Sequence, residues 1–167
     1  MPSRGSLRVR PRTAPGGDPH PLALELLGRR AYSVRELVRK LEDRGFSAAV
    51  AHAEARRLEA SGLLDDSALA HALVATELRR GKGRRAAAVA LRRRGVRAEP
   101  REAALEGIDP EDEAKALSQA VERACAARPE WRRLPGERRK VVRYLLARGF
   151  GIAQVLDELA RREGESE

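Results

Sequence analysis

The chain has 167 residues, of which 42% are apolar, 35% are charged and only 3% are aromatic. This length allows one domain or a row of small units, and the scarcity of aromatic side chains argues against a β-sandwich and against sequence-specific reading of single-stranded RNA. The formal net charge is +9, and 30 of the 34 basic residues are arginine. The expected partners are therefore nucleic acid, an acidic protein surface, or both.

The cysteine content and the apolar runs indicate where the protein works. Cys125 is the single cysteine, so no internal disulfide can form and a reducing compartment is expected. It lies among alanines and is interpreted as a small core residue rather than a reactive thiol. The longest apolar run has six residues, too short for a transmembrane helix, and no secretory signal follows the N-terminus. We expect a cytoplasmic protein that does not bind membranes.

Residues 1–21 are rich in Pro, Gly, Ser and Arg, with four basic residues against one acidic residue. Such a segment cannot bury enough apolar surface to fold, so it is predicted to be a disordered basic arm. The simpler interpretation is a solvated tail, and the alternative is a weak, non-specific contact with phosphate.

From residue 22 onward the chain repeats the motif Leu-x-x-Arg-Gly-(Phe/Val), at Leu41–Phe46, Leu91–Val96 and Leu145–Phe150. A glycine just past a helix end takes the left-handed conformation, an arginine suits the helix dipole, and the following apolar residue packs back on the leucine. The spacings of about 50 residues indicate tandem helical units. We predict an all-α fold of three tandem three-helix repeats that form an elongated, curved array, with repeats at residues 22–64, 65–108 and 109–167.

The first repeat is predicted to hold helices at about 22–29, from Ser33, and at about 47–61. Ser33 and Glu36 match the capping box S-x-x-E. Helical spacing predicts the buried positions Leu37, Val38, Leu41, Val50, Ala53 and Leu58.

The second repeat opens on Asp65 and Asp66, with helices predicted at about 66–80, 83–94 and 99–107. Two adjacent aspartates could signal a metal or an acid–base site, but N-capping of the first helix is the better interpretation. The turn Gly81-Lys82-Gly83 lacks the pattern of a phosphate-binding P-loop. The predicted buried positions are Leu69, Ala72, Leu73, Thr76, Ala87, Ala88 and Leu91.

The segment Leu78–Ala98 holds nine basic residues and no acidic one, around an apolar centre. Clustered arginines on a folded scaffold attract polyanions, although a charge run alone can also be a solvated face. Arg94 has equivalents in every repeat and is assigned to the helix end. The candidate partner- or DNA-binding residues are Arg79, Arg80, Lys82, Arg84, Arg85, Arg92 and Arg93.

The third repeat has equal numbers of acidic and basic residues. Asp109 and Pro110 start a helix to about residue 127, a loop carries Trp131 as a lid on the core, and helices follow at about 136–148 and 151–163. The predicted buried positions are Val141, Val142, Leu145, Ile152, Val155, Leu156 and Leu159.

No catalytic, metal or cofactor motif is found, and His20, His52 and His71 are scattered along the chain. We therefore expect a binding protein with no cofactor rather than an enzyme. Two kinds of binding protein remain open from the residues alone: a general DNA- or RNA-binding protein and an adaptor for an unrelated acidic protein.

The order of the motifs resembles the RecX regulatory proteins of bacteria. The resemblance rests on Ser33–Phe46, on Gly62-Leu-Leu-Asp-Asp66, on Gly81-Lys-Gly83 and on the repeated Leu-x-x-Arg-Gly motifs, and it covers residues 22–163. It implies three tandem three-helix units and a monomer that binds the RecA recombinase and the RecA–DNA filament. It also implies that the protein inhibits or modulates the ATP hydrolysis, strand exchange and coprotease activity of RecA. Leu69 stands where the family often has an aromatic residue.

Overall fold

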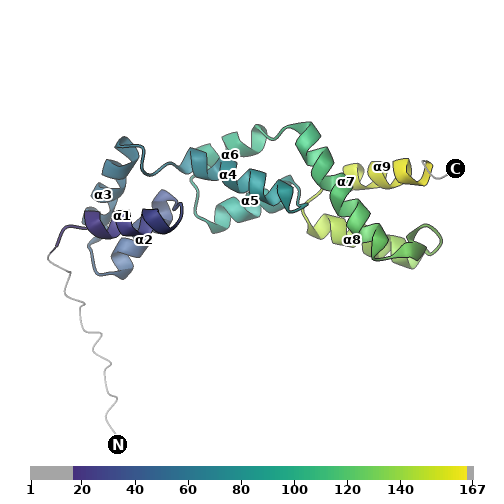
Figure 1. The fold of residues 1–167 in the computed structure, drawn as a ribbon, viewed down its shortest axis with the longest axis horizontal. Helices are drawn as coiled ribbons and strands as arrows, with labels where there is room; N and C mark the ends of the chain where they lie inside the picture. Colours follow the sequence, from purple (N-terminus) through teal and green to yellow (C-terminus); the bar gives the residue numbers. More distant parts are fainter. Residues whose placement is uncertain (1–16, 165–167) are drawn as a thin grey trace, which may run out of the picture. The chain divides into compact units, whose positions relative to one another are not determined.

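The computed structural model describes residues 17–164, which form nine α-helices and one 3-10 helix, without a strand in this part of the chain. The all-α prediction is confirmed. The chain divides into two compact units, the first ending at Leu64 and the second beginning at Asp65 (Figure 1). Within the described range, no helix is both long and apolar enough to cross a bilayer. The predicted basic arm falls mainly outside the described residues, and α1 starts within its predicted range, at His20.

The first unit contains α1 (His20–Arg29), α2 (Val34–Asp43) and α3 (Ala48–Ala60). Ser33 and Glu36 form the predicted capping box at the start of α2. The His20 imidazole lies 2.6 Å from the buried Glu54 carboxylate and so links the start of α1 to α3. The core of this unit is made by Ala23, Leu26, Tyr32, Leu37, Val38, Leu41, Ala51, Ala55, Leu58 and Leu64.

Two predicted core positions of α3 are wrong, because Val50 and Ala53 are exposed. The helix instead buries Ala51, Ala55 and Leu58, which share a face by their four- and three-residue spacing. Alanine lies on several faces of this helix, so apolar spacing alone could not select the buried one.

The second unit contains six α-helices and a short 3-10 helix. These are α4 (Asp66–Arg79), α5 (Arg84–Arg93), α6 (Ala98–Glu106), α7 (Pro110–Ala126), η1 (Pro129–Arg132), α8 (Pro135–Ala147) and α9 (Ile152–Gly164). Helices α4–α6 form the second three-helix repeat and α7–α9 form the third. Each repeat has its own apolar core, and Leu78 at the end of α4 packs against both cores.

The repeated motif ends a helix in the same way in each repeat. Gly45, Gly95 and Gly149 have positive φ angles. In each case the amide after the glycine donates a hydrogen bond to the carbonyl of the motif leucine, for example from Val96 to Leu91 at 3.1 Å. This is the Schellman arrangement that the sequence predicts.

The two aspartates at the start of α4 have different roles. The Asp65 carboxylate accepts hydrogen bonds from the amides of Ser67 and Ala68, so the predicted N-cap is confirmed. Asp66 is buried, and its Oδ2 accepts from both the backbone amide and the Nε of Arg97. Asp66 therefore fixes the start of α6 against α4.

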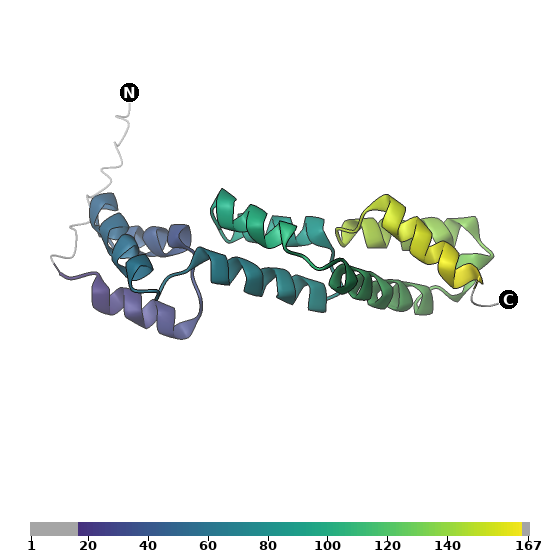
Figure 2. The same ribbon diagram turned by 90° about the horizontal axis from the view of Figure 1, so that it is seen from above.

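The second and third repeats meet at the motif of the third repeat. The Gly83 amide donates to the Arg148 carbonyl, and the Arg85 amide donates to the Gly149 carbonyl. The Arg148 guanidinium donates to the carbonyls of Arg80 and Gly81 at the end of α4. Figure 2 shows the end of α4 beside α7 in this unit. The sequence predicts that the motif arginine acts at the end of its own helix. In the third repeat this arginine, Arg148, also binds the preceding repeat.

This junction requires glycine on both sides. A Cβ on Gly149, whose φ is +91°, would collide with the backbone nitrogen of Ala86, and a Cβ on Gly83 would lie 2.7 Å from the Phe150 ring. The two backbones can approach this closely only without side chains.

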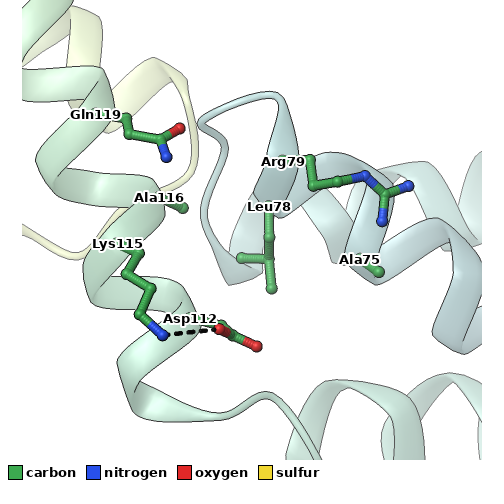
Figure 3. A pocket seen from close by; sticks show the side chains of 7 residues that line it. All are labelled: Ala75, Leu78, Arg79, Asp112, Lys115, Ala116 and Gln119. Carbon is green, nitrogen blue, oxygen red and sulfur yellow. Dashed lines mark ion pairs between the residues drawn. The ribbon is translucent and has the colours of Figure 1, made fainter.

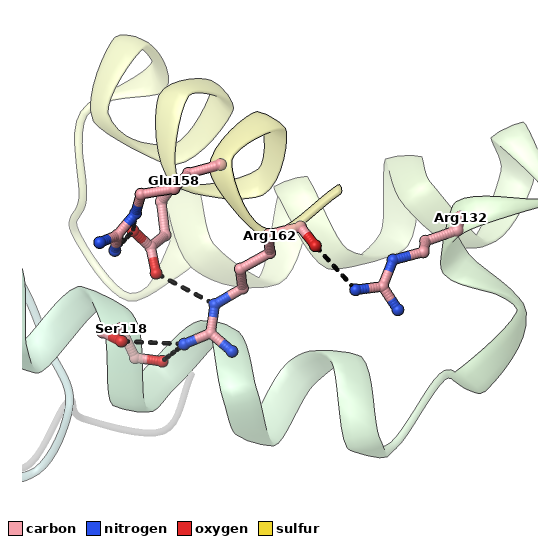
Figure 4. A network of polar contacts seen from close by, with 5 residues as sticks. Ser118, Arg132, Glu158 and Arg162 are labelled. Carbon is pink, nitrogen blue, oxygen red and sulfur yellow. Dashed lines mark hydrogen bonds and ion pairs between the residues drawn. The ribbon is translucent and has the colours of Figure 1, made fainter. Parts of the chain in front are cut away.

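The third repeat is stabilised by Trp131 and by a polar network around Glu158. Trp131 is buried in the core, as predicted, and lies on η1 rather than in an irregular loop. The buried Glu158 carboxylate accepts hydrogen bonds from Arg161 and Arg162, and Arg162 also donates to the carbonyl and hydroxyl of Ser118 (Figure 4). Burial acts to raise the pKa of Glu158, but the two arginines outweigh it and hold the pKa below its usual range.

Three more predicted core residues are exposed in this unit: Ala72, Ile152 and Leu156. On α9 the helix buries Val155, Glu158 and Leu159, so the polar Glu158 takes part of the inner face. Ile152 and Leu156 lie at the edge of that face, where an apolar pattern does not distinguish core from rim.

We predict that Gly149→Ala destabilises the protein more than Gly81→Ala. Both residues have positive φ, but a Cβ on Gly81 would meet its neighbours only at 3.6 Å or beyond. Gly81→Ala should lower the free energy of unfolding by about 1–2 kcal/mol, the conformational cost alone. Gly149→Ala should lower it by about 2–5 kcal/mol, because a steric collision is added. Urea unfolding of both variants measures the difference, and equal losses would contradict a tight junction.

We also predict that Glu158 stabilises the fold in a pH-dependent way. Because its pKa is lowered in the folded state, its contribution is present above about pH 4.3, the ordinary glutamate pKa, and is lost as the pH falls through the folded value. Glu158→Gln should lower the free energy of unfolding by about 1–3 kcal/mol at pH 7, with a smaller difference near pH 3.5. The exposed neighbour change Asp157→Asn is the control. A loss that is the same at both pH values would contradict this role.

Candidate nucleic-acid and protein interface

The seven candidate residues lie along the end of α4, the turn after it and both ends of α5. All are exposed except Lys82, which is half-buried. The candidate cations are therefore at the surface. They differ in whether a carboxylate of the described chain pairs with them.

Two of the seven cations are paired within the repeat. The buried Glu77 carboxylate lies 3.1 Å from the Arg80 guanidinium and 2.6 Å from the Lys82 ammonium. These two charges are partly neutralised and held against the end of α4. The three-residue spacing of Glu77 and Arg80 is a sequence signal for this pair. Counting the charges of Leu78–Ala98 misses it, because Glu77 lies just before that segment.

Arg79 lies at the edge of a hollow of about 450 Å³ between α4 and α7. Figure 3 shows its side chain beside Ala75 and Leu78, opposite residues of α7. Its guanidinium donates to the Thr76 hydroxyl, 3.1 Å away. The facing Lys115 is shared by Glu111 and Asp112. Arg79 is the cation of this hollow that has no carboxylate partner within the described chain.

Arg84, Arg85, Arg92 and Arg93 are exposed, and their guanidinium groups have no hydrogen-bond or ion-pair partner among the described residues. Arg85, Val89 and Arg92 follow four- and three-residue spacing and so share one face of α5. Val89 between them is 55% exposed. We call these three residues, together with Arg84 and Arg93 at the two ends of the helix, the α5 basic face.

The start of α5 carries cations where a helix dipole disfavours them, since Arg84 and Arg85 stand in its first turn. The helix has no side-chain cap from its own residues. Glu113 of α7 supplies the missing carboxylate: its Oε1 accepts the Arg84 backbone amide at 3.0 Å. The third repeat therefore helps to hold the basic helix of the second. Because 29 residues separate the two partners, nothing in the local sequence predicts this contact.

Within residues 17–164, no group of three or more His, Cys, Asp or Glu side chains is placed to hold a metal ion. His71 bonds to the Ser67 carbonyl of its own helix. Burial raises the pKa of the Cys125 thiol against the opposing charges of Arg162 and Arg132, which favours the neutral thiol.

Two protein-family models match the chain. The model described as the first three-helix domain of RecX matches residues 22–58, and the model for its second three-helix domain matches residues 65–105. The matches fall on α1–α3 and on α4–α6, the repeats that precede and carry the α5 basic face.

Full-length relatives extend the similarity. The regulatory protein RecX of a Thermus thermophilus strain is 39% identical over 153 residues, covering 90% of this chain and 97% of the relative. That of Halorhodospira halophila is 33% identical over 148 residues, covering 87% and 88%. The crystal structure of RecX from Lactobacillus salivarius superposes with a TM-score of 0.76 at 18% identity, over 85% of this chain and 92% of the other. This last match supports the fold.

We predict that releasing Arg80 and Lys82 strengthens polyanion binding. Glu77→Gln removes their shared carboxylate and should steepen the dependence of log affinity on log salt by about 0.9 for each additional phosphate that the protein neutralises. Fluorescence anisotropy with a double-stranded DNA oligonucleotide at several salt concentrations measures this slope. Glu106→Gln, an exposed residue of α6, makes the same change in net charge and should leave the slope nearly unchanged. An identical response of both variants would contradict a specific role of Glu77.

Proposed function

Because the chain belongs to the RecX family, we propose that it binds the RecA recombinase and the RecA–DNA filament and that it inhibits or modulates their activities. The relatives that it matches over most of their length are named regulatory proteins, which supports a regulatory role. The RecA activities that we propose it affects are ATP hydrolysis, strand exchange and coprotease activity.

The α5 basic face carries the proposal. Its four guanidinium groups have no partner among residues 17–164, so they can pair with phosphates in a bidentate way, and they can pair with carboxylates of a protein surface in the same manner. Val89 adds a small apolar contact between them. Arg79, Arg80 and Lys82 extend the positive charge toward α4 and would act mainly in steering, since two of them are already paired.

The mechanism would be steric and electrostatic rather than chemical. A chain of three-helix repeats seated on a nucleoprotein filament would block its growth or hold its protomers in a state that hydrolyses ATP poorly. We propose that the repeats at residues 22–64, 65–108 and 109–167 serve as three contacting modules, and that the protein acts as a cytoplasmic monomer without a cofactor. The basic arm of residues 1–21 would add a non-specific phosphate contact.

A general DNA- or RNA-binding protein that acts without RecA is the second candidate. The arginines of the α5 basic face, which have no partner among the described residues, favour it because they need only phosphates as partners. An adaptor for an unrelated acidic protein would use the same cations. Pull-down of RecA with and without nuclease treatment separates these functions, since only direct binding to RecA persists after nuclease treatment.

We predict that the double variant Arg85→Glu/Arg92→Glu loses inhibition of RecA. Reversing two charges on one helical face should weaken binding by about 10-fold or more, because attraction becomes repulsion. The measurement is ATP hydrolysis by RecA on single-stranded DNA, titrated with this protein.

The matched control is Arg35→Glu/Arg56→Glu, which makes the same charge change at exposed positions of α2 and α3. Because the proposal assigns the main contact to the α5 basic face, the control should retain more inhibition than the α5 variant. If the α5 variant still inhibits RecA like the parent protein, the α5 basic face is not the contact surface. If a saturating amount of the parent protein leaves the RecA ATPase rate unchanged, the proposed function itself is wrong.

A further inference from the structure

An apolar surface on α8 and α9 lies outside the α5 basic face. Ile152 and Leu156, one turn apart on α9, are 48% and 43% exposed. Val142 and Leu146 on α8 are half-buried and pack against the core of the third repeat. Exposed apolar side chains are ordinary when they are scattered singly, but these four are grouped.

The two helices bring these side chains together. Helices α8 and α9 pack against each other, and Arg138 near the start of α8 pairs with Glu163 near the end of α9, so the helices run antiparallel (Figure 1). Leu146 lies two turns after Arg138, and Leu156 lies two turns before Glu163. Helical geometry therefore places Leu146 and Leu156 at the same level along the pair.

One flank of this surface is cationic. Arg139 shares a face with Val142 and Leu146 by its three- and seven-residue spacing, and Arg143 lies next to it. Both guanidinium groups are exposed and have no partner within the described residues. The nearby Lys140, by contrast, pairs with Glu137 at 2.6 Å. The other flank, along α9, carries the exposed Ala153, Asp157 and Ala160, so its one charge is acidic and the cations lie on the α8 side alone.

We propose that this α8–α9 surface, formed by Arg139, Val142, Arg143, Leu146, Ile152 and Leu156, binds an amphipathic helix of a protein partner that has an apolar stripe and acidic residues along one side. The apolar stripe covers the four aliphatic side chains, and the carboxylates meet Arg139 and Arg143. The charged flank fixes which side of the bound helix faces α8. This inference does not depend on the function proposed for the α5 basic face.

Two other occupants fit the surface less well. Nucleic acid would leave the four aliphatic side chains without complementary groups, since no aromatic ring for base stacking is among them. A second copy of the chain would need about 800 Å² on each partner for a stable contact, more than four partly exposed aliphatic side chains provide.

The test uses fluorescein-labelled peptides of ~16 residues with leucines on one helical face and either glutamates or lysines along one side. Anisotropy is titrated with the full-length protein. The acidic peptide should bind at least about 10-fold more tightly than the basic one. Leu156→Gln should weaken its binding about 10-fold, and Arg139→Glu/Arg143→Glu should abolish the preference for the acidic peptide.

Leu24→Gln is the matched control, because Leu24 is a helical leucine of similar exposure, 41%, in the first unit. It should bind the acidic peptide like the parent protein. No binding of the acidic peptide, equal binding of both peptides, or equal loss in the Leu24 and Leu156 variants would overturn the proposal. Sedimentation velocity supplies the last arm: self-association that Leu156→Gln removes would assign the surface to a second copy instead.

Discussion

The close approach of two backbone segments, at Gly83 and Gly149, is the constraint on which the second unit depends. It aligns the carbonyls of Arg148 and Gly149 with the amides of Gly83 and Arg85 and lets the Arg148 guanidinium reach the end of α4. A side chain at either glycine would separate these segments. Leu78 also packs against both cores, so the two small apolar cores of these repeats are linked by a shared side chain.

The same junction shapes the electrostatics of the α5 basic face. An isolated helix that begins with two arginines would oppose its own dipole, and Glu113 from the third repeat offsets this at the helix start. The fold pairs some cations and leaves others unpaired. Glu77, Asp66 and Glu158 hold Arg80, Arg97, Arg161 and Arg162 in structural pairs, whereas the guanidinium groups of four α5 arginines have no partner in the described part of the chain.

The third repeat thus has two roles in one unit. Its inner contacts position the α5 basic face, through Glu113 and Arg148. Its outer side presents Ile152 and Leu156, and α8 beside them carries two arginines that have no partner within residues 17–164. The repeats therefore carry cations in two different surroundings on separate helices: the arginines of α5 flank the single exposed Val89, whereas Arg139 and Arg143 lie next to aliphatic side chains of α8. Such a division would let each contact be altered without disturbing the other.

Local signals in the sequence determined the helices, their caps and the recurring glycine ends, because capping and left-handed turns depend on residues only a few positions apart, such as Ser33 with Glu36 and Leu91 with Val96. They also located the seven candidate cations. Only the tertiary structure decided which cations are paired, which faces of the alanine-rich helices are buried, and that Ile152 and Leu156 are exposed. Those outcomes depend on contacts between residues far apart in the chain, such as Arg84 with Glu113 and Arg148 with Arg80. Helical periodicity predicts which face of a helix makes such a contact, but it does not determine which distant residue lies opposite that face.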